Sequence, residues 1–410
     1  MFSPQEPGVL LIHITGQDRI GVTHALTEIL ARSEVRILDI GQAVIHDALA
    51  LGLLVEWTPE MKASPLLSDL LLKAHGLGVQ IRFTEVSGQD YQSWVAGQSK
   101  LRFLITLLGR SITAAHLAAV SGVVSGAGLN IDRIDRLSAR TPLCPAEAPS
   151  RVCVELAASG EAAQEDALRA ELLRLTEEHE IDIAFQHDNV YRRSRRLVAF
   201  DMDSTLIRTE VIDELAQIAG AGEQVRKITE SAMRGELDFP ASFRKRVSLL
   251  RGLPVSALDQ VRARVPLMDG AERLITTLRR LGYKTAILSG GFTFVGRELQ
   301  RRLGIDYLHA NELEIRGGFV TGEVPSEIVD GPRKAALLQR IAASENLRLE
   351  QVIAVGDGAN DLPMLRIAGL GIAFRAKPVV RRSARQSIST LGLDGILYLL
   401  GVRDREAGVF

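Results

Sequence analysis

Two short apolar segments that each end in carboxylates constrain the fold of this chain most strongly. Residues 197–200 (LVAF) run directly into DMDST at 201–205, and residues 351–355 (QVIAV) run into GDGAND at 356–361. Short, nearly unbroken apolar runs are typical of parallel strands buried on both faces. In an open α/β sheet such strands bring their polar ends to one carboxyl edge, where ligands bind. The pattern predicts an α/β domain with an acidic site at the edge of a parallel sheet.

Two later segments add groups that suit a phosphate. Residues 284–288 (KTAIL) predict another buried strand, which ends at Ser289, Gly290 and Gly291. Small residues allow a hydroxyl and backbone N–H groups to approach a phosphate closely. Lys334 lies early in a helix predicted over residues 333–341. Each feature alone could be a turn or a helix cap, but the four together, in this order, indicate phosphate chemistry.

The motifs DxDxT, Ser-Gly, a lone lysine and GDGxND resemble those of the haloacid dehalogenase superfamily of phosphotransferases, over residues 197 to about 400. The resemblance implies a Rossmann-like α/β core with an inserted helical cap. It also implies that Asp201 attacks phosphorus and forms an aspartyl-phosphate. Asp203 would protonate the leaving alkoxide and later activate water, and Lys334 would supply positive charge.

The same resemblance implies a Mg²⁺ site and a phosphate site. Mg²⁺ would bind the carboxylates of Asp201 and Asp357 and the backbone carbonyl of Asp203, with Asp361 supporting this shell. Ser289 and the Gly290 N–H would hold phosphate oxygens. Asn360 would support the phosphate or the surroundings of Asp357.

A helical insertion between Asp203 and Ser289 predicts a cap over about 211–265, with helices over 211–219, 225–233 and 240–250. Its motifs resemble those of the phosphoserine phosphatase family; they are Glu210, Met233-Arg234-Gly235 and Phe239-Pro240-x-Ser242-Phe243-x-x-Arg246. The resemblance implies that Glu210 binds the substrate ammonium and Arg246 its carboxylate, while Met233 and Phe239 exclude water. The alternatives are a helix-dipole role for Glu210, a solvated basic face for Arg246 and ordinary cap core for Phe239.

The first half of the chain predicts the element order β-α-β-β-α-β twice, over residues 8–88 and 100–187. This order is that of ferredoxin-like α+β modules. The turn Gly16-x-Asp18-Arg19-x-Gly21 resembles the effector loop of ACT domains, and Gly109 holds the equivalent place in the second copy. The resemblance implies amino-acid binding near Gly16, Asp18 and Gly109, with a structural turn as the alternative.

The basic run YRRSRR at 191–196 predicts a solvated linker over 188–196, followed by the catalytic domain over 197–402.

Net charge and hydropathy limit the classes of molecule that the chain is expected to bind. Lys and Arg total 49 and Asp and Glu total 50, so the net charge of −1 gives no field to hold nucleic acid. No targeting or membrane-spanning segment is apparent, and two cysteines cannot form a disulfide framework, which favours the cytoplasm. ACT modules imply a homodimer or higher homo-oligomer, because they usually bind ligand between copies.

The resemblances together imply hydrolysis of O-phospho-L-serine to L-serine and phosphate, the final step of L-serine biosynthesis, with feedback by an amino acid such as serine. Two alternatives stay open. The core could act on another small phosphorylated metabolite, or transfer the phosphoryl group to an alcohol such as homoserine. The chain could also be an amino-acid sensor whose phosphatase half is inactive.

Overall fold

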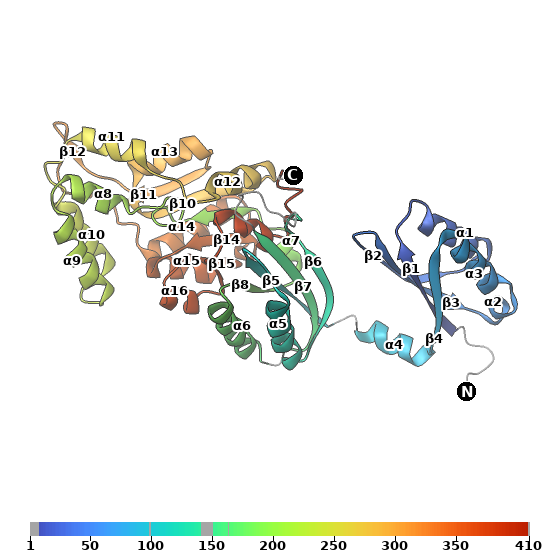
Figure 1. The fold of residues 1–410 in the computed structure, drawn as a ribbon. Helices are drawn as coiled ribbons and strands as arrows, with labels where there is room; N and C mark the ends of the chain where they lie inside the picture. Colours follow the sequence, from blue (N-terminus) through green and yellow to red (C-terminus); the bar gives the residue numbers. More distant parts are fainter. Residues whose placement is uncertain (1–7, 98–99, 141–150, 163, 409–410) are drawn as a thin grey trace. The chain divides into compact units, whose positions relative to one another are not determined.

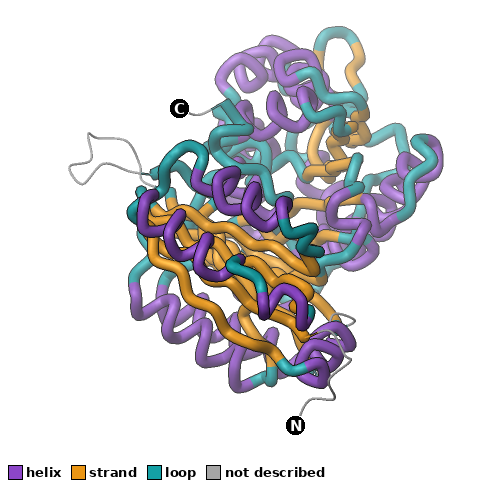
Figure 2. Tube along the Cα trace, turned by 90° about the vertical axis from the view of Figure 1, so that its right-hand side faces the viewer, coloured by secondary structure: helices purple, strands orange, loops and turns teal. Residues whose placement is uncertain are grey.

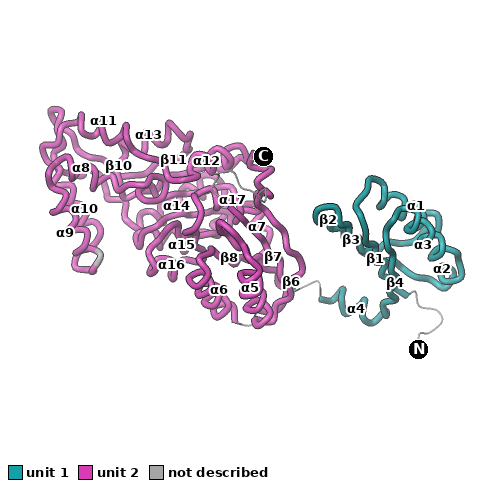
Figure 3. Tube along the Cα trace, viewed as in Figure 1, with its two compact units in different colours: residues 1–100 teal, residues 101–410 magenta. Residues whose placement is uncertain are grey.

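Residues 8–97, 100–140, 151–162 and 164–408 are described by the computed structural model. The chain divides into two units, residues 1–100 and residues 101–410 (Figure 3). Among the described residues, no helix is long and apolar enough to cross a membrane.

The first unit is an antiparallel sheet of order β2-β3-β1-β4 with the predicted β-α-β-β-α-β order. Its elements are β1 (Gly8–Gln17), α1 (Val22–Arg32), β2 (Ile37–Ile45), β3 (Ala48–Trp57), α2 (Pro59–Ala63), α3 (Leu66–Leu77), β4 (Val79–Val86) and α4 (Gly88–Ala96). Helices lie against one face of this sheet (Figure 2). Alternate residues of β1, such as Ile12 and Ile14, pack in one core with residues of α1 and α3, whereas His13 and Thr15 are exposed. The helix α4 was not predicted.

The second unit begins with another sheet of this kind, of order β6-β7-β5-β8. Its elements are β5 (Leu101–Gly109), α5 (Ala114–Gly126), β6 (Leu129–Arg136), β7 (Val152–Gly160), α6 (Glu165–His179) and β8 (Asp182–His187). Here β5 is buried on both faces from Phe103 to Leu108. Its two helices cover only one face, so other parts of the chain must cover the second.

The catalytic half contains a parallel sheet of order β11-β10-β9-β14-β15-β16, which confirms the predicted α/β fold class (Figure 1). Its elements are β9 (Leu197–Phe200), α12 (Ala271–Arg280), β10 (Lys284–Phe292), α13 (Thr293–Leu303), β11 (Tyr307–Asn311), α14 (Gly331–Ser344), β14 (Val352–Gly356), α15 (Leu362–Ile367), β15 (Leu370–Phe374), α16 (Pro378–Ser383), β16 (Gln386–Ile388) and α17 (Ile396–Leu399). Successive strand residues alternate between two cores: Val198 and Phe200 pack on the side of α12 and α13, and Leu197 and Ala199 on the side of α14 and α15.

The cap is inserted between β9 and α12. It comprises α8 (Val211–Ile218), α9 (Gly222–Met233), α10 (Phe239–Ser248) and α11 (Val255–Arg264), of which α11 was not among the predicted helices. Two adjacent segments connect it to the core: Ile207 pairs with Leu267, and the Met268 N–H donates to the Leu206 carbonyl at 2.8 Å. A hairpin of β12 (Ile315–Arg316) and β13 (Phe319–Val320), also not predicted, supports the cap through its backbone.

The prediction of a solvated basic linker is wrong for two of its arginines. Arg192, on α7 (Val190–Arg193), and Arg195 are buried. Arg192 forms an ion pair of 2.6 Å with Glu155 on β7, and Arg195 donates to the Gln186 side chain at 3.1 Å. These partners replace part of the water that the guanidinium groups lose. Gln351 beside β14 accepts from the Arg196 N–H at 3.0 Å and donates to the Ser194 carbonyl at 2.9 Å, so the segment also holds to the catalytic half.

Other contacts extend this attachment. The buried Asp182 carboxylate at the start of β8 accepts hydrogen bonds from the Ser389 N–H and from the N–H and hydroxyl of Thr390. The Gln386 side chain on β16 exchanges two hydrogen bonds with the Phe185 backbone on β8. Leu108 belongs to the same hydrophobic core as the catalytic sheet. The second α+β module is therefore an integral part of the catalytic body.

Candidate active site

Three neighbouring strands bring the predicted catalytic groups together. Asp201 follows β9, Asp357 follows β14, and Ser289 lies in β10; β9 pairs with both other strands. The Asp201 N–H donates to the Val355 carbonyl at 2.9 Å, which continues the ladder beyond the last residue of β9. Parallel pairing thus places side chains that are far apart in sequence at one sheet edge.

Lys334 links two of the carboxylates. It lies in α14, is fully buried, and its Nζ is 2.8 Å from Asp201 Oδ2 and 2.7 Å from Asp361 Oδ1. Burial alone would lower the pKa of Lys334, but the charges of Asp201 and Asp361 outweigh it and raise the pKa. The ammonium therefore stays charged inside the protein.

The remaining carboxyl groups repel one another. Burial, with the charges of Glu210 and Asp201, raises the pKa of Asp203 well above its ordinary value. Burial, with the charges of Asp201 and Asp361, raises the pKa of Asp357 to about 8, although Thr205 donates a hydrogen bond of 2.9 Å to it. Such crowding is relieved by a cation.

A divalent metal fits this donor set. One carboxylate oxygen from each of Asp201, Asp357 and Asp361 lies within 4.8 Å of the others. Oxygen-only ligands of this kind suit a hard divalent cation. Asp361 already accepts hydrogen bonds from Lys334 and, at 2.9 Å, from the Gly358 N–H.

The segment 289–291 is held by a buried residue that the sequence did not reveal. Asn311, at the end of β11, donates from Nδ2 to the Gly290 carbonyl at 2.8 Å and accepts from the Val329 N–H at 2.9 Å. It therefore ties the Ser289-Gly290 turn to the segment that precedes α14 and Lys334. An asparagine at a strand end is too common to signal this role by itself.

The cap places a carboxylate and a guanidinium near this site. The Ser204 hydroxyl donates to Glu210 Oε1 at 2.8 Å. Partial desolvation raises the pKa of Glu210, although the residue keeps a solvent-exposed edge. Arg246 is partly buried and its buried Nε has no hydrogen-bond partner among the described residues, whereas Arg244 and Lys245 beside it are exposed. Arg246 is thus not part of a solvated basic face.

Phe239 brings the cap into contact with the predicted phosphate turn. A Cβ atom at Gly290 would lie 2.7 Å from Phe239 Cζ, so the ring lies directly against this glycine. The ring also stacks on Phe243, with centroids 6.0 Å apart.

Asn360 lies in the one-turn helix Ala359–Asp361 that follows β14. Met233 ends α9, and its side chain lies outside the described residues.

Of the predicted effector residues, Gly16 lies near the end of β1 and Gly109 is the last residue of β5, so both belong to strands and not to turns. A Cβ at Gly16 would lie 2.9 Å from Val79 Cγ1, and one at Gly109 would lie 3.2 Å from Ile181 Cγ2. Asp18 is exposed and its N–H donates to the Asp47 carbonyl at 2.6 Å. Close packing against Val79 and Ile181 accounts for both glycines, so amino-acid binding there stays a prediction.

The parallel sheet, its acidic edge with Lys334 and the inserted cap define a haloacid dehalogenase-like hydrolase domain, and the two β-α-β-β-α-β modules that precede it are ACT domains. The family model described as haloacid dehalogenase-like hydrolase matches residues 198–366, and ACT domain models match residues 8–84 and 103–186.

Relatives that match nearly the whole chain show which family of hydrolases it belongs to. The chain is 43% identical over 397 residues to a phosphoserine phosphatase of Streptomyces coelicolor, covering 97% of this chain and 93% of the relative. It is 42% identical over 398 residues to one of Mycobacterium tuberculosis, covering 97% and 94%. The chain belongs to the phosphoserine phosphatase family.

Solved structures agree with this assignment. A haloacid dehalogenase family hydrolase of Salmonella enterica serovar Typhi matches with a TM-score of 0.63 and 32% identity, over 72% of this chain and 98% of that one. A probable phosphoserine phosphatase of Vibrio cholerae matches with a TM-score of 0.58 and 34% identity, over 74% and 88%.

Proposed function

We propose that this chain hydrolyses O-phospho-L-serine to L-serine and phosphate, as the names of its relatives indicate for those proteins. The observation that carries the proposal is Arg246. Its guanidinium is half-buried in the cap, lies within the electrostatic reach of Glu210 and Asp203 and forms no ion pair within the described part of the chain, so it is suited to receive a carboxylate from outside the chain.

The arrangement fits a phosphorylated amino acid. Arg246 would bind the substrate carboxylate, Glu210 would bind the ammonium, and Ser289 with the Gly290 N–H would hold the phosphate. Phe239 would exclude water above Gly290, because its ring contacts that residue. Met233 and Asn360 complete the proposed binding residues by family resemblance.

The chemistry would then proceed in two displacements on phosphorus. An Asp201 oxygen attacks phosphorus, the bond from phosphorus to the serine oxygen breaks, and Asp203 donates its proton to the leaving alkoxide. Asp203 next takes a proton from a water molecule, which attacks phosphorus and frees Asp201 and phosphate. The raised pKa of Asp203 fits a carboxyl group that is protonated before the first step. Lys334 orients Asp201 and offsets its charge.

We assign Mg²⁺ to the carboxylates of Asp201 and Asp357 and the backbone carbonyl of Asp203. Asp361 supports this shell, because its oxygens already accept hydrogen bonds from Lys334 and Gly358. The ion would supply positive charge that offsets the repulsion between the Asp201 carboxylate and the phosphate.

A substrate panel tests the proposal. Phosphate release is measured for O-phospho-L-serine, its methyl ester and small phosphate esters that lack the carboxylate, using wild type, Arg246→Ala and the exposed neighbour variant Arg244→Ala. We expect the wild type and Arg244→Ala to prefer phosphoserine, and Arg246→Ala to lose roughly a hundredfold in kcat/KM on phosphoserine alone. Equal activity on the methyl ester would contradict the assignment of Arg246. Transfer to homoserine as acceptor, or no release from any ester, would favour phosphotransfer or sensing instead.

We also propose a cytoplasmic homodimer or higher homo-oligomer that binds serine as an effector through its ACT domains. The support is the match of two ACT models and the separate first unit. Serine inhibition that persists unchanged after removal of residues 1–99 would contradict a role for the first ACT domain.

A further inference from the structure

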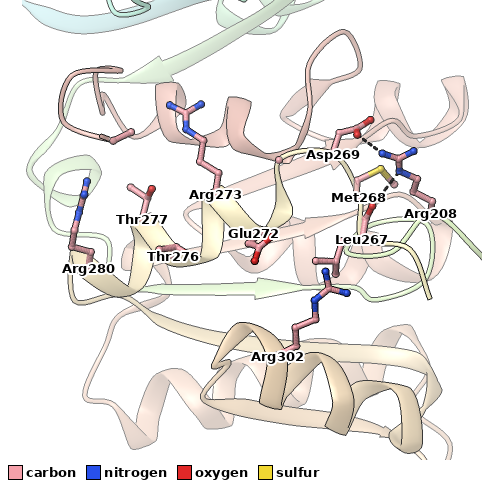
Figure 4. A pocket seen from close by; sticks show the side chains of 12 residues that line it. Arg208, Leu267, Met268, Asp269, Glu272, Arg273, Thr276, Thr277, Arg280 and Arg302 are labelled. Atoms are coloured by element: carbon pink, nitrogen blue, oxygen red, sulfur yellow. Dashed lines mark hydrogen bonds and ion pairs between the residues drawn. The ribbon is translucent and has the colours of Figure 1, made fainter. Parts of the chain in front are cut away.

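A cavity lies at the base of the cap, apart from the catalytic residues. It has a volume of about 620 Å³, within the range of small-molecule sites. Its walls come from the two segments that connect cap and core, from α12, from the end of α13 and from Ala407 near the C-terminus (Figure 4). None of the residues assigned to catalysis lines it.

Four arginines line this cavity against two carboxylates. Two of the four already have acidic partners: Arg208 pairs with Asp269, and Arg273 pairs with Asp394 and Asp404 at 2.7 and 2.9 Å. Their charges are therefore largely satisfied within the protein.

The other two arginines are not compensated in this way. Arg280 ends α12 and donates to the Glu406 backbone carbonyl, which is uncharged, and Arg302 lies in the last turn of α13. Neither forms an ion pair with any residue that the structure describes. Figure 4 shows Arg302 extending from its helix toward Leu267 and Glu272. Two guanidinium groups from separate helices thus border one cavity with no carboxylate bound to either.

Hydroxyl groups add further donors. Thr276 and Thr277 follow Arg273 on α12 and also line the cavity. Guanidinium and hydroxyl groups together are the usual ligands of phosphate and carboxylate groups. Of the two carboxylates that line the cavity, Glu272 forms no ion pair within the described part of the chain. Its negative charge disfavours a ligand whose anionic group lies next to it.

We propose that this cavity is a binding site for a small metabolite with at least two negative charges, carried on phosphate or carboxylate groups, and that Arg280 and Arg302 bind it. One wall is the hinge of the cap, where Arg208 donates from Nε to the Leu267 carbonyl at 3.1 Å. The ligand therefore contacts the segment that connects the cap to the core. The site is distinct from the proposed substrate site.

Charge reversal with a matched control tests this proposal. Binding of sulfate and of citrate is measured by calorimetry in metal-free buffer for wild type, Arg302→Glu, Arg280→Glu and Arg301→Glu. Arg301 is the neighbour of Arg302 on α13, is exposed, pairs with Glu298 at 2.6 Å and does not line the cavity. Any binding at the catalytic site is common to all four proteins. Thermal unfolding of each variant verifies its fold, and Arg302→Gln replaces Arg302→Glu if the latter is unfolded.

We expect at least one probe to bind the wild type and Arg301→Glu equally, and to bind the two cavity variants about tenfold or more weakly, because each loses a charge-assisted hydrogen bond. Loss of sulfate binding would indicate a phosphate ligand, and loss of citrate binding alone a polycarboxylate. The proposal is overturned if neither probe binds the wild type, or if Arg302→Glu and Arg301→Glu bind both probes equally.

Discussion

Replacing Gly290 by alanine tests whether the cap rests on the phosphate turn during the reaction. The added Cβ would lie 2.7 Å from Phe239 Cζ and 3.4 Å from the Val329 carbonyl oxygen. Ordinary carbon–carbon contacts are about 3.5–4.0 Å, so the ring, or the cap that carries it, must retreat by roughly 1 Å. The carbonyl contact is tolerable, and the strain is therefore concentrated on Phe239.

The size of the effect follows from that overlap. Overpacking by one methyl group costs about 1–3 kcal/mol. If the closed cap bears this cost, kcat/KM for phosphoserine falls roughly 5- to 150-fold. Phe239→Leu removes the clashing Cζ atom, so the double variant should recover most of the activity that Gly290→Ala loses.

Steady-state kinetics of the single and double variants measure this coupling. Gly122→Ala is the control, because a Cβ at this helical position in α5 meets no atom within 4 Å. Wild-type kcat/KM in Gly290→Ala would show that the cap does not rest on Gly290 in the reacting enzyme. A double variant no better than Gly290→Ala would place the defect elsewhere.

Three further results are expected. Removal of residues 1–99 should leave a folded, active enzyme. Removal of residues 1–188 should abolish cooperative unfolding in calorimetry, because it uncovers the hydrophobic core that the second module shares with the catalytic sheet. Equal unfolding temperatures for the two truncated proteins would contradict this prediction. Asn311→Leu should lower the free energy of unfolding in urea by about 1–3 kcal/mol, since the buried Val329 N–H and the partly buried Gly290 carbonyl lose their partner, and an unchanged value would show that these groups find other partners. Chelation of divalent metal should lower the Tm of the wild type and have less effect on the Tm of Asp357→Asn. A Tm that does not change on chelation in either protein would contradict the assigned site.

The catalytic motifs were accessible from sequence because each is local. Asp201 and Asp357 directly follow strands whose apolar runs are visible in the chain, and parallel pairing of those strands then brings their ends together. Strand pairing therefore suffices to predict the acidic edge, whereas the role of Lys334, which lies in a helix, was implied only by the resemblance of the motifs to those of a known superfamily. The order of elements in both α+β modules was visible for the same reason.

Features that depend on distant partners were not accessible. The burial of Arg192 requires Glu155, which lies on another strand, and the role of Asn311 requires the Gly290 carbonyl and the Val329 N–H. A basic run looks the same in sequence whether water or a carboxylate surrounds it. The sequence of β5 is that of an ordinary apolar strand, and it does not indicate that the catalytic core covers the second face of this strand.

The most direct measurement of the central claim is phosphate release from O-phospho-L-serine with and without Mg²⁺, by the wild type and by Asp201→Asn. Asparagine keeps the shape of the side chain but removes the nucleophilic carboxylate, and Lys334 should keep the variant folded through Asp361. We expect Mg²⁺-dependent release by the wild type and none by Asp201→Asn. Release by Asp201→Asn at the wild-type rate, or no release by the wild type with Mg²⁺, would contradict the account.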